Sequence, residues 1–198
     1  MKKITVMALT AAMLLTLFAG CGAKEEAPET TLAPETTLAP ETTLAPEAED
    51  DMMENADLNE AGKLIETTLA NHAELDLPMM TTNLDLTNVD LLTYNTGLTS
   101  GDKIAEAAVS EPMMGQPFSL VVLKVKDAAD AAEVAQEVYD SVDQRKWVCM
   151  EADTKIGGYT DDVVMFFMVS SDFEDTATVT SMMDAFKAAV GTEVTEIN

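Results

Sequence analysis

The feature that most limits the fold is a short repeat near the start of the chain. The hexapeptide Glu-Thr-Thr-Leu-Ala-Pro occurs three times in succession, from Glu29, Glu35 and Glu41. Proline every six residues prevents a regular helix, and one leucine per repeat cannot build a hydrophobic core. We therefore expect residues 21–56 to be a Pro/Thr/Glu-rich disordered tether, and the only globular domain to lie in residues 57–198.

The residues before this tether have the pattern of an export signal. Lys2 and Lys3 precede an apolar run over residues 4–18, and a small Ala-Gly pair stands directly before Cys21. This order is typical of a secretory signal peptide. The Ala-Gly-Cys end of the run resembles the lipobox of bacterial lipoproteins. The resemblance implies that residues 1–20 are removed, that Cys21 is acylated, and that the protein is held by lipid on the extracytoplasmic face of the cell membrane.

The charge of the chain excludes some classes of partner. The formal net charge is −25, and residues 57–198 contain 26 Asp and Glu against eight Lys and Arg. Such a surface repels the phosphate backbone, so we expect no nucleic-acid binding. It also repels anionic headgroups, so the lipid rather than a basic patch is expected to provide the anchor.

Hydrophobic periodicity predicts an alternation of helices and strands in the globular part. In chain order, the expected elements are helix 57–72, a short helix 87–94 in an otherwise irregular segment 76–102, strand 103–111, strand 118–126, helix 127–143, strand 154–160, strand 163–170 and helix 175–190. For residues 103–111 a helix is the alternative. Asp57 with Glu60, and Thr87 with Asp90, have the spacing of capping boxes. Strand 163–170 is apolar on both faces, so it should be central in the sheet.

This order of elements predicts an α+β domain. We expect a two-layer sandwich, in which a mainly antiparallel sheet of about four strands packs against two to three helices. If the helices all covered one face, the other face of strand 163–170 would need a cover or a partner.

Three stretches of the chain resemble a known family. Residues 118–134, 145–153 and 162–169 are similar to a domain-of-unknown-function family of small lipoproteins from Gram-positive anaerobic, clostridial-type bacteria. The resemblance implies a lipobox, an acidic low-complexity tether and one small α+β domain. That family has no assigned activity, so it implies no catalytic residues.

Few residues are candidates for a metal or ligand site. Asp85, Asn88 and Asp90 offer closely spaced oxygen ligands for calcium, but the glycine and the distal glutamate of an EF-hand loop are missing. Arg145 and Trp147 are candidate ligand contacts, because a cation beside an indole can bind a carboxylate or a sugar face. The alternative for this pair is a surface ion pair of Arg145 and a core position for Trp147.

Other reactive side chains are expected to be structural. Cys149 lies in an apolar stretch without a neighbouring histidine, which favours a buried structural thiol. His72, the only histidine, is expected at a helix C-terminus. The methionine pairs at 79–80 and 113–114 fall in predicted loops and leave copper(I) open as an alternative, whereas the pair at 182–183 is expected in the core.

Nothing in the sequence indicates catalysis. It contains no nucleophile elbow, zincin motif or phosphate loop, and a single histidine excludes zinc sites with several histidines. We therefore expect no enzyme activity and no cofactor, and predict a surface module that binds a protein partner in the cell envelope. A small-ligand or calcium receptor is the alternative, and an envelope hydrolase a more distant one.

Overall fold

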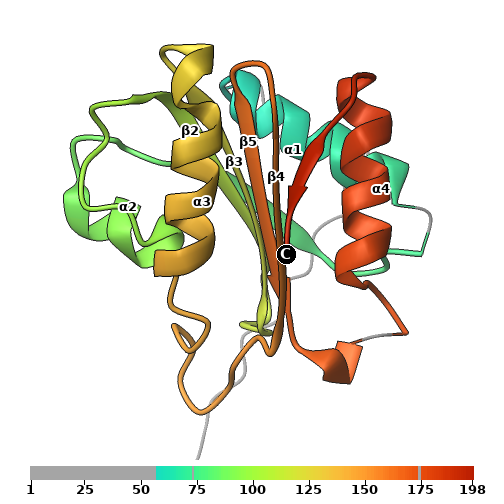
Figure 1. Cartoon of the computed structure of the whole chain (residues 1–198). Coiled ribbons are helices and arrows are strands. Elements are labelled where there is room, and N and C mark those ends of the chain that lie inside the picture. Colours follow the sequence, from blue (N-terminus) through green and yellow to red (C-terminus); the bar gives the residue numbers. More distant parts are fainter. Residues whose placement is uncertain (1–56, 73, 174) are drawn as a thin grey trace, which may run out of the picture. The chain divides into compact units, whose positions relative to one another are not determined.

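The computed structural model describes residues 57–72, 74–173 and 175–198 (Figure 1). The predicted signal peptide, Cys21 and the predicted tether lie outside the described residues. In chain order, the elements are α1 (Glu60–Asn71), β1 (Met79–Asn83), α2 (Val89–Thr96), β2 (Ile104–Pro112), β3 (Phe118–Val125), the 3-10 turn η1 (Ala128–Asp130), α3 (Ala131–Ser141), β4 (Thr154–Thr160), β5 (Val163–Val169), the 3-10 turn η2 (Ser171–Phe173), α4 (Val179–Val190) and β6 (Thr195–Ile197).

The strands form one open sheet in the order β1-β2-β3-β5-β4-β6, with every neighbouring pair antiparallel. The predicted α+β class is confirmed, but the predicted four strands are too few. The two additional strands, β1 and β6, are short and pair on one side only. Their sequences lack a strong apolar alternation, and both are defined mainly by their neighbours in the sheet.

The two central strands, β3 and β5, are buried on both faces. Alternate residues of β5 enter different cores: Phe166 packs with α3, whereas Phe167 packs with α1 and α4. On the second face, Phe118 of β3 meets Phe167 edge to face, with ring centroids 4.8 Å apart. Each such buried side chain contributes about 1.5–3 kcal/mol. The prediction that strand 163–170 is central and covered on both sides is confirmed.

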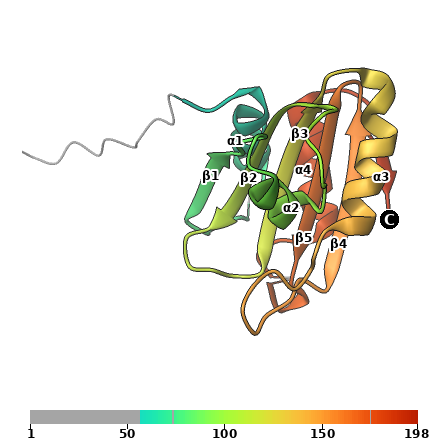
Figure 2. The same ribbon diagram turned by 90° about the vertical axis from the view of Figure 1, so that its left-hand side faces the viewer.

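Helices cover both faces of the sheet, so the domain has three layers. Figures 1 and 2 show α2 and α3 on one face, and Figure 1 shows α1 and α4 on the other. The predicted two-layer arrangement is therefore wrong. Both apolar faces of β5 need a cover, and the stripe of α3, centred on Val134 and Val138, packs on the face opposite the stripes of α1 and α4.

The helices begin at caps other than the predicted ones. Asn59, rather than Asp57, caps α1 by accepting a hydrogen bond from the N–H of Gly62. Asn88, rather than Thr87, caps α2 through the N–H of Leu91. Ser, Thr, Asp and Asn can all occupy the N-cap position of a helix. The tertiary contacts of each loop decide which of the nearby candidates does so. The predicted helix 127–143 also begins as the 3-10 turn η1, and the predicted helix 175–190 begins at Val179.

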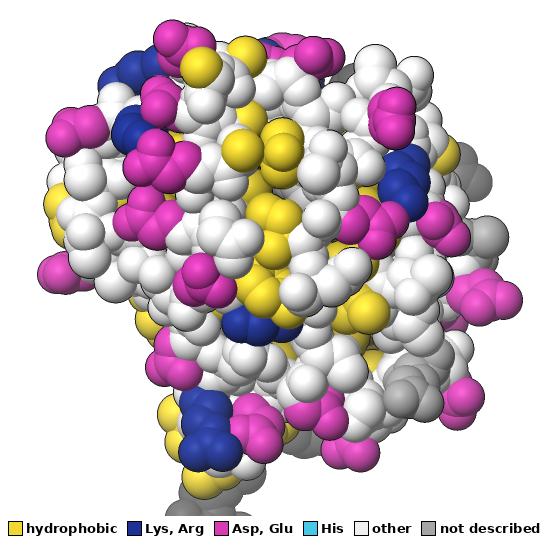
Figure 3. Space-filling view, in the orientation of Figure 1, with side chains coloured by type: hydrophobic (Ala, Val, Ile, Leu, Met, Phe, Trp, Pro, Cys, Tyr) yellow, Lys and Arg dark blue, Asp and Glu magenta, His cyan; other side chains and the backbone are white. Residues whose placement is uncertain are grey.

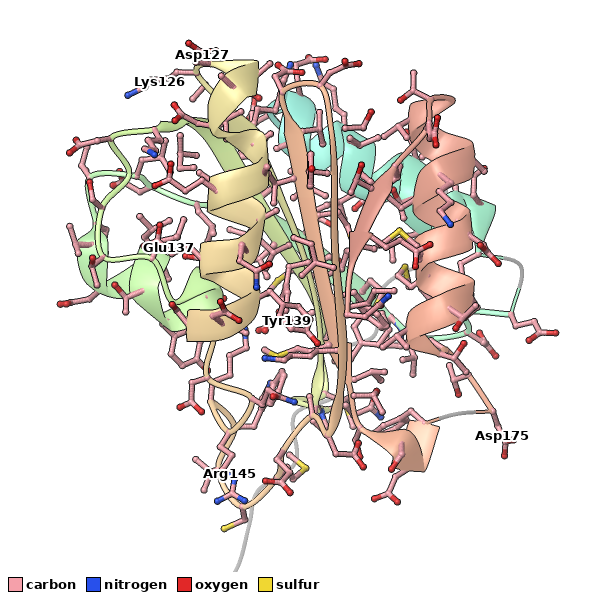
Figure 4. All side chains as sticks on the ribbon, in the orientation of Figure 1. Lys126, Asp127, Glu137, Tyr139, Arg145 and Asp175 are labelled. Carbon is pink, nitrogen blue, oxygen red and sulfur yellow. The ribbon has the colours of Figure 1, made fainter. Side chains whose placement is uncertain are left out.

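Figure 3 looks onto the sheet edge formed by β4 and β6 and shows apolar side chains in a stripe between α3 and α4. β6 pairs with β4 only over residues 157–159. On β4, Nζ of Lys155 lies 4.2 Å from the centroid of the ring of Tyr139, which Figure 4 labels, and donates to the Tyr139 carbonyl. A lysine on a strand edge discourages pairing with another chain, so this edge is protected.

Candidate functional site

The loop of residues 142–153, between α3 and β4, lies at one end of the sheet (Figure 1). The same end carries the β2–β3 turn, residues 113–117, because β2 ends and β3 begins there. Arg145, labelled in Figure 4, stands in this loop. The predicted ligand contacts therefore lie where several connections meet rather than on the sheet itself.

The centre of this end is Lys146, which lies between the two predicted contacts. Its side chain is only 1% exposed, and its Nζ lies 2.5 Å from Oε1 of Glu111 at the end of β2. The ammonium also donates to Oδ1 of Asn95 at 3.2 Å and to Oγ of Ser119 at 3.1 Å. Partners from α2, β2 and β3 thus hold one cation from the loop.

Two aromatic rings complete the surroundings of Lys146. Its Nζ lies 5.1 Å from the ring centroid of Tyr94 and 5.2 Å from that of Trp147, both within cation–π range. The Tyr94 hydroxyl donates to the Lys146 carbonyl at 3.3 Å, so α2 and the loop are joined twice. The arrangement fixes the loop against α2.

Burial has a measurable effect on this cation. Removal of the ammonium from water lowers the pKa of Lys146 below its usual 10.5, and the carboxylate of Glu111 opposes the shift. Desolvation also raises the pKa of Tyr94, with smaller contributions from the carboxylates of Glu111 and Asp143. Since the lysine is enclosed and already bonded, its role is to hold the loop in place.

The two residues predicted to contact a ligand occupy different environments. Arg145 is exposed, and its Nε donates to Oε2 of Glu151 at 2.5 Å within the same loop. Trp147 is partly buried and packs on the core beneath α3. The structure therefore matches the alternative of a surface ion pair and a core tryptophan. Lys146 was missed because nothing in its own neighbourhood predicts its burial.

Two cavities adjoin the loop and share Cys149, Met150 and Glu151. One, of about 340 Å³, extends to Pro117 of the β2–β3 turn and to η2, and the other, of about 470 Å³, extends to Arg145 and Trp147. Cys149 is exposed, so the prediction of a buried thiol is wrong. The loop has a left-handed backbone at this residue, with φ of 63°.

The far end of the loop is tied to η2 by Asp153. Its two carboxylate oxygens accept from the N–H of Ser171 at 2.6 Å and from the Ser171 hydroxyl at 2.5 Å. These hydrogen bonds lower the pKa of Asp153. The loop is therefore anchored at Lys146 and again at Asp153, and residues 148–151 between them are exposed.

Two of the three predicted calcium ligands, Asp85 and Asn88, are already used in local hydrogen bonds. Oδ1 of Asp85 accepts from both the N–H and the hydroxyl of Thr87, and Oδ1 of Asn88 caps α2. Asp90 lies in the first turn of that helix. Within the described residues, no group of three or more His, Cys, Asp or Glu side chains is placed to hold a metal ion.

His72 directly follows α1, as predicted, but its ring is buried between helices. Nε2 lies 2.8 Å from Oγ of Ser181 at the start of α4, beside a cavity of about 350 Å³. Ser181 belongs to a capping box: its Oγ accepts from the N–H of Thr178 and lies 3.0 Å from the Thr178 carbonyl. Because the Ser181 hydroxyl is used in the cap of α4, we interpret this His–Ser pair as structural.

Eight large apolar side chains are exposed among the described residues. Three are on α2, and five are at the end of the sheet that carries the loop: Met80, Met113, Met114, Val148 and Met150. We call these five residues, together with Tyr94 of α2, the apolar end. Its parts are connected, because Met80 pairs with Glu111, Glu111 binds Lys146, and Lys146 contacts Tyr94.

Comparisons with known protein families, with curated proteins and with solved structures found no match. Among the described residues, no helix is both long and apolar enough to cross a membrane.

Proposed function

We propose that this protein is a non-catalytic interaction module, held by a lipid on Cys21 at the extracytoplasmic face of the cell membrane, that binds a protein partner of the envelope through its apolar end. The anchor is inferred from the signal peptide and lipobox pattern. The observation that carries the binding proposal is the apolar end itself. Clustered exposed apolar side chains on an otherwise charged surface are typical of interaction sites.

The charge of the whole domain indicates the chemistry of the partner. All eight Lys and Arg of residues 57–198 already have a partner within the domain, six of them a carboxylate. Most of the 26 carboxylates therefore remain unneutralised. A partner with an apolar centre and a basic rim complements this surface, whereas a second copy of the acidic domain is repelled.

The rigidity of the surface supports the same proposal. The buried Lys146 and the Asp153–Ser171 hydrogen bonds hold the loop on both sides of Val148 and Met150. Little conformational entropy is then lost when a partner binds. Val148 is 87% exposed, so its side chain is available to a partner rather than to the core.

The proposal is tested by site-specific photo-crosslinking in intact cells. A photo-crosslinkable amino acid is placed at Val148 in the apolar end or, as the control, at Asp127, which lies at the opposite end of the domain (Figure 4). We expect a defined adduct from position 148 alone, and its loss when Tyr94→Asp is added. No adduct at 148, equal adducts from both positions, or an adduct that survives Tyr94→Asp contradicts the proposal.

A small-solute receptor is the second candidate, because the two cavities at the loop meet around Cys149, Met150 and Glu151. Ligand pockets typically measure about 300–1,000 Å³, so either cavity is large enough. Thermal unfolding against a panel of sugars and peptides tests it. A ligand at a hundred times its Kd adds about 2.7 kcal/mol to stability. A panel without any shift contradicts this second candidate.

A further inference from the structure

Two methionine pairs that are far apart in the sequence meet at one corner of the sheet. β1 begins with Met79 and Met80, and its register places Met79 opposite Pro112 and Met80 opposite Glu111. The pairing extends one step further, because the N–H of Met113 donates to the Pro78 carbonyl at 2.9 Å. Met113 therefore lies beside the first residues of β1.

The turn after β2 fixes the second pair. The N–H of Gly115 donates to the Pro112 carbonyl at 3.3 Å, so Met113 and Met114 are the two central residues of a β-turn. Gly115 has φ of 63°, which lets the chain leave the turn toward β3. The methionines of this turn are held on a short, hydrogen-bonded corner rather than on a long loop.

Three thioethers of this corner face solvent. Met80, Met113 and Met114 are 58%, 69% and 77% exposed, whereas Met79 packs against the core beneath α1. On an antiparallel ladder, Met80 and Met113 are diagonal neighbours on one face. Such neighbours are about 7–8 Å apart, within reach of long side chains. Methionine has three rotatable bonds, so their sulfur atoms are able to converge.

We propose that Met80, Met113 and Met114 form a binding site for a soft monovalent cation, Cu(I). Thioether sulfur prefers Cu(I) and is a poor ligand for hard cations such as Ca²⁺ and Mg²⁺. The surplus of carboxylates in residues 57–198 attracts cations, and the nearest buried ammonium, Lys146, is already paired with Glu111. We call these three residues the thioether corner.

This inference goes beyond the proposed function, although the thioether corner is part of the apolar end. The two are separated by Met→Leu substitutions, because leucine keeps the apolar surface and removes the sulfur. Loss of Cu(I) binding with an unchanged crosslink at position 148 supports both proposals. Retention of Cu(I) binding in the same variant overturns the metal site alone.

The experiment is a competition titration of the full chain, in detergent and without oxygen, against the coloured bicinchoninate complex of Cu(I). The background carries Cys21→Ala, so that Cys149 is the only thiol. The test variants are Met80→Leu, Met113→Leu and the triple variant with Met114→Leu. The chain offers a matched control in Met52→Leu with Met53→Leu, a methionine pair at another place in the sequence.

We expect one Cu(I) per chain. Each single test variant should weaken binding by more than tenfold, since even indirect changes around a metal typically cost about 10–100-fold. The triple variant should abolish binding, and the Met52, Met53 control should leave it unchanged. Binding that survives the triple variant, that is lost with Cys149→Ser, or that is lost in the Met52, Met53 control overturns the proposal. Absence of Cu(I) binding by the unaltered chain also overturns it.

Discussion

Nζ of Lys146, in the loop before β4, lies 2.5 Å from Oε1 of Glu111, at the end of β2. The two side chains differ in exposure, at 1% for the lysine and 29% for the glutamate. Removal of one partner leaves the other uncompensated, and the cost depends on whether water can reach it. The pair therefore predicts an asymmetric response to mutation.

Glu111→Gln should reduce the free energy of unfolding by about 3–5 kcal/mol, because it leaves a buried ammonium without its counter-charge. Lys146→Met should cost less, about 1–3 kcal/mol, since the Glu111 side chain is partly exposed, although its Oε1 is itself buried. Urea denaturation of both variants measures the difference. Equal losses, or a larger loss for Lys146→Met, contradict the assigned burial.

The lowered pKa of Lys146 predicts a pH dependence of stability. Between its pKa in the fold and its usual 10.5, the unfolded chain binds more protons at this site than the folded chain. Stability conferred by this group therefore rises with pH in that window. The raised pKa values of Lys63, Lys103 and Tyr94 act in the opposite direction, but only above about pH 10.

The measurement is denaturant unfolding at a series of pH values below 10.5, with Lys146→Met as the reference. The unaltered chain should gain stability relative to that variant as the pH rises. A difference that stays constant or falls across this range would show that the ammonium is not desolvated.

Substitution of Gly97, at the end of α2, tests how closely this helix approaches α3. Its φ is 76°, and Gly115 and Gly191 have similar left-handed values of 63° and 67°. A Cβ at Gly97 would lie 2.6 Å from the carbonyl oxygen of Ser141, whereas at the other two glycines it would meet nothing within 4 Å.

All three Gly→Ala variants should lose about 1–2 kcal/mol from the left-handed backbone. Gly97→Ala should lose about 1–3 kcal/mol more, because backbone atoms of α3 must move. It should also change the fluorescence of Trp147, the only tryptophan, since α2 and the loop share the Lys146 contacts. Similar losses for all three variants would contradict the close approach of the two helices.

Cys21→Ala should release the protein from membranes and abolish incorporation of a labelled fatty acid, because the lipid is the proposed anchor. Fractionation of cells that express either form measures the change. Cys149→Ala is the matched control, since Cys149 is the other cysteine of the chain and is exposed. A labelled Cys21→Ala protein that still partitions with membranes contradicts the lipobox interpretation.

Most of the fold was predictable where a segment carries its own apolar pattern. The strand Thr154–Thr160 matches its prediction, and β5 differs from its prediction by one residue. β1 and β6 were not predicted, because Met-Met-Thr-Thr-Asn and Thr-Glu-Ile have little periodicity of their own. Such short edge strands exist through hydrogen bonds to a neighbour, and that neighbour is distant in the sequence.

The candidate site shows the same limit. The sequence Arg145-Lys146-Trp147 places two cations beside an indole in an acidic chain, and this pattern predicted a ligand contact. Which cation is buried depends on Glu111, Asn95 and Ser119, none of which is near it in the sequence. Exposure of Cys149 was likewise unpredictable, since its apolar neighbours indicate a core position.

The sequence by itself determined the α+β class and the central position of β5, because both depend on local hydrophobic periodicity. The tertiary structure alone decided that helices cover both faces, that Lys146 is enclosed, and that the methionines of β1 and of the β2–β3 turn share one corner. These features arise when the chain folds back on itself. Burial, ion pairing and convergence of ligands depend on distances between segments, and a local pattern does not contain those distances.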